Sequence, residues 1–239
     1  MTLTDAELAA RALEIDPDRS TFILAVGRKG SGKSAACELI FDSWPYDRVV
    51  LDVTGDAKPS DPHTIALTAP FPSQLPEPRE PGERVTVWAR VDPRSPTYLE
   101  DQDEALNLAL YPRHTPVLFW EDEHGQSGTA NMIKPNHRLM LQSSRHYYVS
   151  CLFACPRPRQ IPVLTIQQAD KVLIFITPNK EDRELIANNI GYPVALFELA
   201  YKEMIRQGPH WFLLWDSQLG RLFLCPPLPI GHTSGRPRA

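Results

Sequence analysis

The sequence predicts an α/β fold with a mostly parallel sheet, flanking helices and a carboxyl-terminal β-hairpin. Short apolar runs alternate with amphipathic stretches, a pattern typical of parallel strands joined by crossover helices. A length of 239 residues with 42% hydrophobic content suits one large domain with a sizeable core. The 24 prolines, about 10% of the chain against an average near 5%, cluster between these stretches and favour short elements.

The first half of the chain supplies strands and helices in alternation. Apolar runs predict the strands, and apolar residues at helical spacing predict the helices. We expect a helix over 5–13, a strand over 21–26, a helix over 33–42, a strand over 48–53, a proline-rich surface excursion over 54–82, a strand over 84–90, a helix over 98–110 and a very apolar strand over 117–120.

The second half continues the pattern and ends in two adjacent strands. Pro135 suits the first turn of a helix that runs toward Arg145. We expect strands over 147–154 and 171–177 with a proline-flanked turn of helix between them, then helices over 180–189 and 194–206. The last two strands, over 211–215 and 221–225, form a hairpin joined by residues 216–220.

The predicted elements divide the chain into three segments. Residues 1–20 form an amino-terminal helical extension, 21–230 the main domain, and 231–239 a polar tail. The amino terminus is acidic where a signal peptide is basic, and no apolar run approaches the ~20 residues of a membrane span. A protein without a membrane segment, in the cytoplasm (the host cytoplasm if it is viral), is the simplest interpretation.

The net charge of −4 hides an uneven distribution along the chain. Residues 124–169 contain no Asp or Glu and carry +5, so the rest of the chain carries −9. A basic surface on an acidic body suits a protein that meets a polyanion at one place. A scatter of solvated arginines is the alternative, and charge alone does not decide between them.

One glycine-rich segment carries specific chemistry. Gly27-Arg28-Lys29-Gly30-Ser31-Gly32-Lys33-Ser34 fits the P-loop pattern G-x-x-x-x-G-K-[ST] between an expected strand and helix. The glycines let the backbone wrap phosphates, and the helix adds its positive amino-terminal end. We expect Lys33 to reach the β- and γ-phosphates of ATP and Ser34 to ligate Mg²⁺. The motif predicts a P-loop NTPase but leaves open how the energy is used.

A second motif supplies the acidic groups that hydrolysis requires. The strand over 117–120 ends in Glu121-Asp122-Glu123. A carboxylate at the end of a neighbouring strand holds the Mg²⁺ shell, and another orients water. We assign Asp122 to magnesium and Glu123 to water activation. A register that uses Glu121 and Asp122 is the alternative, and a solvated acidic turn without function is a third interpretation.

With these motifs the chain resembles the FtsK/HerA branch of P-loop motor ATPases, whose fold is RecA/ASCE-like. The resemblance rests on the P-loop, on Leu51-Asp52-Val53-Thr54-Gly55-Asp56 after the second strand, and on Asp122-Glu123. It rests further on Ser144-Arg145-His146 before a strand, Pro156-Arg157-Pro158 after it, and Gln168-Ala169-Asp170 before the next strand. It covers residues 21–190.

The resemblance implies roles for two further positions. Arg145 matches the position at which such motors present an arginine to the neighbouring subunit's nucleotide, with Arg138 as a second candidate and a surface arginine at a helix end as the alternative. The family places a glutamine that senses the γ-phosphate where this chain has Pro156, and proline cannot donate a hydrogen bond. The sensor therefore stays unassigned.

The resemblance implies an ATP-hydrolysing DNA-translocation motor for viral genome packaging or mobile-element DNA transfer. It further implies a hexameric ring around double-stranded DNA, with contacts to the DNA backbone. The alternatives are a nucleotide-dependent assembly or switch protein with slow or no turnover, and a small-molecule kinase. No arginine-rich lid is evident in the sequence, which disfavours the kinase.

Overall fold

The computed structural model describes Glu7 and residues 15–55, 57–78, 80, 82–111, 115–124 and 133–228. Among these, nine strands form one sheet in the order β3-β4-β2-β5-β6-β1-β7-β8-β9. All neighbouring pairs are parallel except β7–β8 and β8–β9. The strands are β1 Phe22–Val26, β2 Asp47–Asp52, β3 Ile65–Thr68, β4 Thr86–Arg90, β5 Val117–Glu121, β6 Val149–Cys155, β7 Lys171–Ile174, β8 Phe212–Asp216 and β9 Arg221–Cys225.

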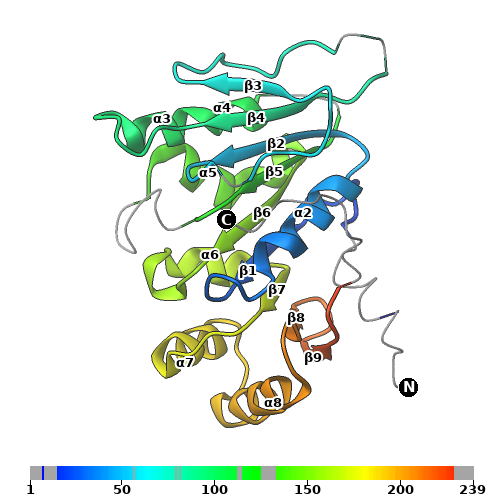
Figure 1. The fold of residues 1–239 in the computed structure, drawn as a ribbon, viewed down its shortest axis with the longest axis vertical. Coiled ribbons are helices and arrows are strands. Elements are labelled where there is room, and N and C mark those ends of the chain that lie inside the picture. Colours follow the sequence, from blue (N-terminus) through cyan, green and yellow to red (C-terminus); the bar gives the residue numbers. More distant parts are fainter. Residues whose placement is uncertain are drawn as a thin grey trace.

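Helices cover both faces of this sheet (Figure 1). One face packs against α2, through Cys37, Ile40 and Phe41, and the other packs against the remaining helices. The helices are α2 Lys33–Ser43, α3 Tyr98–Ala105, α4 Asn107–Leu110, α5 Pro135–Ser143, α6 Val163–Gln168, α7 Lys180–Asn189 and α8 Val194–Gln207, with 3₁₀ turns at Ser144–Tyr147 and Pro158–Gln160.

The central strands are apolar because both of their faces are covered. Every residue of β1 and of β6 is buried, and alternate residues enter the two cores. Ile23 and Ala25 face α2, whereas Leu24 and Val26 face the opposite layer. Near-continuous apolar runs are the expected signature of parallel strands buried on both sides. The predicted α/β fold with its carboxyl-terminal hairpin is confirmed.

Three element predictions need correction. The excursion over 54–82 contains the edge strand β3, which only half-buries alternate side chains and so leaves a weak signal among the prolines. The helix expected over 98–110 is interrupted at Leu106 into α3 and α4. The helix from Pro135 ends at Ser143, and Arg145 lies in a 3₁₀ turn. Apart from Glu7, the predicted first helix lies outside the described residues, as does the tail.

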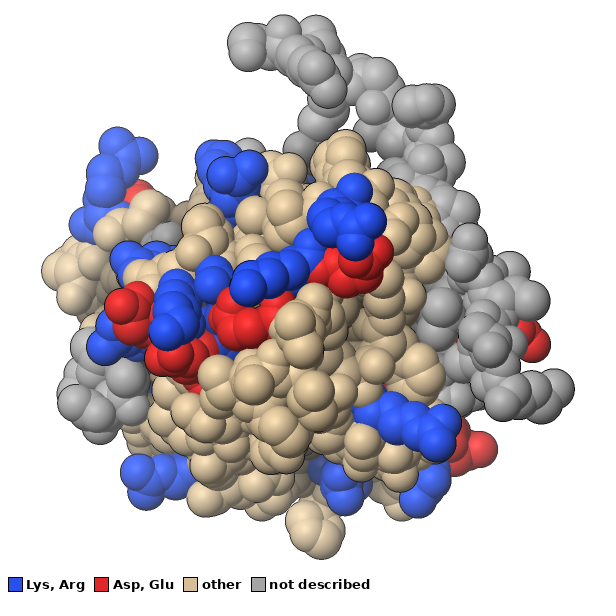
Figure 2. Space-filling view, turned by 90° about the horizontal axis from the view of Figure 1, so that it is seen from below, with Lys and Arg blue, Asp and Glu red and all other residues tan. Residues whose placement is uncertain are grey.

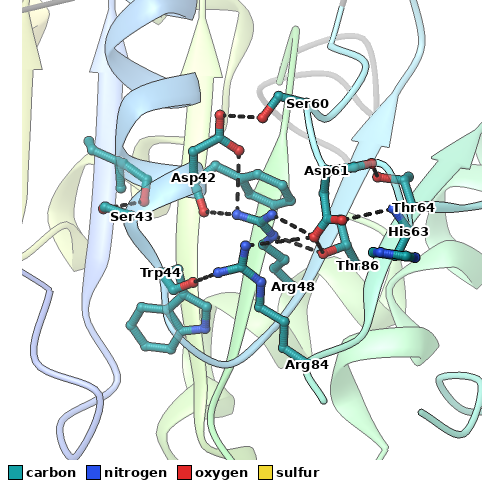
Figure 3. Close-up of polar contacts among 12 residues, drawn as sticks. Asp42, Ser43, Trp44, Arg48, Ser60, Asp61, His63, Thr64, Arg84 and Thr86 are labelled. Atoms are coloured by element: carbon teal, nitrogen blue, oxygen red, sulfur yellow. Dashed lines mark hydrogen bonds and ion pairs between the residues drawn. The ribbon is translucent and has the colours of Figure 1, made fainter. Parts of the chain in front are cut away.

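A buried arginine ties the P-loop helix to the sheet edge (Figure 3). The Arg48 side chain on β2 is 1% exposed and donates to the Phe41 carbonyl at the end of α2 at 2.8 Å. It also pairs with Asp61 at 3.0 Å and donates to the Thr86 hydroxyl on β4 at 2.9 Å. Burial would raise the pKa of Asp61, but hydrogen bonds from the His63 amide, Thr86 and Arg48 lower it. Arg48 therefore joins α2, β4 and the loop before β3.

Replacing Arg48 by methionine should lower the free energy of unfolding by about 3 kcal/mol, because Asp61 loses its buried partner. Urea denaturation measures this. Arg94→Met is the matched control, since the Arg94 side chain is 91% exposed and pairs only locally, with Asp92. The control should stay within about 0.5 kcal/mol of the parent protein. Equal losses in both variants would contradict the assigned role of Arg48.

Candidate nucleotide-binding site

The segment from Gly27 to Ser34 forms a loop between β1 and α2, as the motif predicts. The Gly27 amide donates to the Cys155 carbonyl at 3.1 Å, and the Arg28 amide donates to the Ile176 carbonyl at 2.9 Å. Arg28, Lys29 and Gly30 are exposed at the tip, whereas Ser31 and Lys33 are buried. No side chain caps the amino terminus of α2. Its first amides therefore face the loop interior, as an anion cradle requires.

The loop backbone fits a phosphate cradle at two positions where a side chain is excluded. Gly27 has φ of +154°, and a Cβ there would lie 2.7 Å from Phe175 Cβ and 2.9 Å from Ser31 Oγ. Gly32 has φ of +104°, and a Cβ would lie 3.1 Å from His210 Nδ1. The buried Ser31 Oγ has no hydrogen-bond partner among the described residues. An orphaned donor inside a closely packed loop suits an anionic ligand.

Lys33 lies among groups from both α2 and β6. It is 5% exposed. Burial raises the pKa of the Cys155 thiol to about 12, and the charge of Lys33 opposes that rise while Glu123 and Asp182 add to it. Burial likewise raises the pKa of the Cys37 thiol, with Lys33 opposing and Asp122 adding. The lysine therefore lies within electrostatic reach of the same thiols as Asp122 and Glu123.

The acidic turn after β5 is shaped by its two neighbouring strands. The Asp122 amide donates to the Leu51 carbonyl of β2 at 3.2 Å, and the His124 amide donates to the Ala154 carbonyl of β6 at 2.7 Å. Glu123 lies between these anchors in the left-handed region, at φ of 62°. Such a conformation costs a non-glycine residue of order 1–3 kcal/mol and is concentrated at functional sites. Glu123 shares this conformation with Tyr148 and His210 among the described non-glycine residues, and it alone of the three is a carboxylate.

Glu121 points to the face of the sheet away from α2, where it contacts two histidines. Its Oε2 lies 3.0 Å from His137 Nε2 and 2.9 Å from His124 Nδ1. Burial would raise the pKa of Glu121, but the charges of His124 and His137 and the hydrogen bond to His137 hold it well below its usual range. Burial would lower the pKa of His137, whereas Glu121 and Asp103 raise it to about 9. This arrangement favours the Asp122/Glu123 register over Glu121/Asp122.

Arg145 lies at the other end of the sheet from the loop. It precedes β6, whereas the loop follows the carboxyl end of β1. Its side chain is 73% exposed and pairs with Asp170 at 3.2 Å. It also lines a pocket of about 430 Å³ together with Asp16 and Asp216. The structure therefore does not bring Arg145 together with Lys33 and Glu123 of the same chain.

The basic segment over 124–169 is largely neutralised in three dimensions. Lys134 pairs with Glu100 at 2.7 Å, and Arg157 pairs with Asp182 at 3.5 Å, in addition to the Arg145–Asp170 pair. Arg138 and Arg159 are exposed. The end of the molecule formed by α7 and α8 likewise carries interleaved basic and acidic side chains (Figure 2). Within the described residues, this pairing favours the alternative of scattered arginines over a basic surface.

Three histidines at the site escaped sequence reasoning. His124 and His137 hold Glu121, and His210 Nδ1 lies 3.3 Å from the Ser31 carbonyl, with φ of 66° at His210. The partners of His137 and His210 are remote in sequence, whereas His124 contacts Glu121 only three residues away, within the acidic motif that the sequence did mark. Pro156 follows β6 directly, and the next residue, Arg157, contacts the buried Asp182.

Solved structures with a similar fold include viral NTPases. The genome packaging NTPase B204 from Sulfolobus turreted icosahedral virus 2, in complex with AMP, matches with a TM-score of 0.63 at 16% identity, over 90% of this chain and 100% of that chain. Its complex with AMPPCP matches with a TM-score of 0.63 at 16% identity, over 89% of this chain and 99% of that chain. EssC (ATPases 2 and 3) from Geobacillus thermodenitrificans matches with a TM-score of 0.51 at 12% identity, over 93% of this chain and 41% of that chain. This chain has a P-loop NTPase fold.

Other comparisons add nothing to this result. No protein-family model and no curated protein sequence matches the chain. Within the described residues, no helix combines the length and apolar character needed to cross a membrane.

Replacing Gly27 by alanine should lower the free energy of unfolding by about 1–3 kcal/mol more than replacing Gly30 does. Both positions have positive φ, but a Cβ at Gly30 would meet no atom within 4 Å. The difference therefore reports the clash with Phe175 and Ser31 together with the less tolerated φ at Gly27. Thermal and urea denaturation measure it. Equal destabilisation would show that the close packing around Gly27 is not required.

Proposed function

We propose that this chain hydrolyses ATP with Mg²⁺ to move double-stranded DNA, as an FtsK/HerA-type motor for genome packaging or DNA transfer. Residues 21–230 form the ATPase domain, 1–20 an extension and 231–239 a tail. The observation that carries the proposal is the joint geometry of the loop and the Asp122-Glu123 turn, both anchored on the end of β6. The structural match to a genome packaging NTPase over its whole length supports the DNA-moving role.

The residues divide the chemistry between them. The loop amides from Gly27 to Ser34 and the Lys33 ammonium bind the phosphates, and Glu123 orients the attacking water. Ser34 and Asp122 would hold Mg²⁺, which neutralises phosphate charge when it is bound. Ser34 is exposed at the first turn of α2, and Asp122 acts on the face of the sheet that α2 covers. These oxygen ligands are of the kind that Mg²⁺ prefers.

The place of Arg145 supports a ring assembly if this arginine takes part in catalysis. An arginine that stabilises the transferring phosphoryl must come from a neighbouring subunit if its own loop is out of reach. Arg138 and Arg159 are exposed within the segment 124–169 and are candidate contacts to the DNA backbone. Binding led by phosphate contacts is independent of sequence and falls steeply with salt.

A nucleotide-dependent switch is the second candidate. The proline at position 156 favours it, because that position cannot donate the hydrogen bond of a γ-phosphate sensor. A switch would bind ATP and turn it over slowly, without a response to DNA. Turnover therefore separates the two candidates.

The ATPase rate of the parent protein should rise on addition of double-stranded DNA and fall by about 10²–10⁴-fold in Glu123→Gln, because water loses its base. Phosphate release measures both effects. Glu123→Gln should still bind ATP, whereas Lys33→Ala should lose nucleotide affinity. Glu83→Gln, on the loop before β4, is the matched control and should keep the parent rate. A low rate that DNA leaves unchanged would favour the switch.

Mixing two inactive variants tests the trans role of Arg145. Arg145→Ala should bind ATP without turning it over, and Glu123→Gln should behave likewise. Mixed rings contain some interfaces with an intact Arg145 from one subunit and an intact Glu123 from the next. Partial recovery of phosphate release is therefore expected. An absence of recovery in rings shown to exchange subunits would place both residues in one subunit's site or remove Arg145 from catalysis.

A further inference from the structure

Three buried side chains converge at the end of β5, on the face of the sheet away from α2. Glu121, His124 and His137 are each 2–3% exposed. Each offers one ligand atom, and these atoms lie within 4.8 Å of one another. They come from β5, from the turn that follows it, and from α5. No step of the proposed ATPase chemistry uses them.

The two histidines meet one oxygen of Glu121, and only the His137 contact is a hydrogen bond. His124 Nδ1 lies 2.9 Å from Glu121 Oε2, yet it makes no hydrogen bond within the described part of the chain. His137 Nε2 approaches the same oxygen, at 3.0 Å. A tetrahedral metal with bonds of about 2.0–2.1 Å holds its ligand atoms about 3.3 Å apart. The two distances to Glu121 Oε2 are therefore close to that spacing, and all three ligand atoms lie within 4.8 Å of one another.

The second nitrogen of each imidazole faces an oxygen that orients the ring. His137 Nδ1 lies 3.5 Å from Asp103 Oδ1, and that carboxylate is itself fixed by the Asn136 and His137 amides, both at 3.1 Å. His124 Nε2 lies 3.4 Å from the Thr165 hydroxyl. The His124 ring also stacks on Phe153, at a centroid distance of 4.4 Å and an interplanar angle of 10°. Metal-binding histidines are held by such outer partners.

Charge also favours a cation at this position. Two carboxylates meet the histidines here: Glu121 is buried, and Asp103 is 14% exposed at its side chain. A divalent cation bound by two neutral imidazoles would balance both carboxylates. Imidazole nitrogen suits zinc and its first-row neighbours rather than magnesium.

We propose that Glu121, His124 and His137 form a buried site for Zn²⁺ or a similar first-row divalent metal. The site is separate from the magnesium position assigned to Ser34 and Asp122, because it uses nitrogen ligands and lies on the other face of the sheet. Three protein ligands leave a fourth position for water. The metal joins β5 to α5 beside Glu123, so its binding stabilises the folded turn. This inference does not depend on ATP hydrolysis or DNA.

Titration of the untagged full chain with Co²⁺, without nucleotide, tests the site. One equivalent should bind with the strong visible absorption of tetrahedral Co²⁺, and one equivalent of Zn²⁺ should displace it and raise the Tm. Glu121→Gln and His137→Gln should weaken binding more than 100-fold. Asp103→Asn, which removes an outer partner, should weaken it about 10- to 100-fold.

Two control variants leave Glu121, His124 and His137 unchanged. His146→Gln removes an exposed histidine, and Ser34→Ala removes a ligand of the magnesium position; both should keep the single equivalent. Failure of the parent protein to bind stoichiometric Co²⁺ would overturn the proposal, as would retention of the signal in folded Glu121→Gln. Loss of the Co²⁺ absorption in Ser34→Ala would place the metal at the Ser34 and Asp122 position instead. If His137→Gln does not fold, the proposal is tested by Co²⁺ binding to the parent protein and by the weaker binding expected in Asp103→Asn.

Discussion

Two consecutive carbonyl groups at the end of β6 hold both halves of the candidate site. The Cys155 carbonyl accepts the Gly27 amide of the loop, and the Ala154 carbonyl accepts the His124 amide of the acidic turn. Successive carbonyls of a strand point to opposite neighbours, so β6 reaches β1 on one side and β5 on the other. Strands lie about 4.8 Å apart, which fixes the two backbones at about 10 Å. Side chains from both can then approach one bound phosphate.

The same anchoring explains why the backbone is strained at Glu123. Because Asp122 and His124 are bonded to different strands, the residue between them must turn the chain sharply. Glu123 adopts a left-handed backbone in doing so, although glycine would be the easier residue there. The network around Glu121 stabilises that turn from the far face. A strained residue between rigid anchors keeps its side-chain direction, which orienting a water molecule requires.

The sequence predicted those features whose signals are local. The loop motif, the buried strands and the bounds of α7 follow from neighbouring residues, and the structure confirms them. The features that it missed depend on distant partners. β3 forms only against β4, and the charge of residues 124–169 is balanced by acids outside that segment, such as Glu100 and Asp182. His137 lies 16 residues from Glu121, so only the fold brings them together.

The position of Arg145 constrains any assembly. β6 has seven residues and spans about 23 Å, and Arg145 precedes it while the loop lies beyond its far end. An arginine side chain is much shorter than that distance, so Arg145 cannot act on the loop of its own subunit. A role at a nucleotide requires the amino-terminal edge of one sheet to meet the carboxyl-terminal edge of the next. Such a head-to-tail contact is heterologous, and it forms a closed ring when its rotation closes. In the single chain Arg145 pairs with Asp170 instead, so a role in such a contact would require this pair to open.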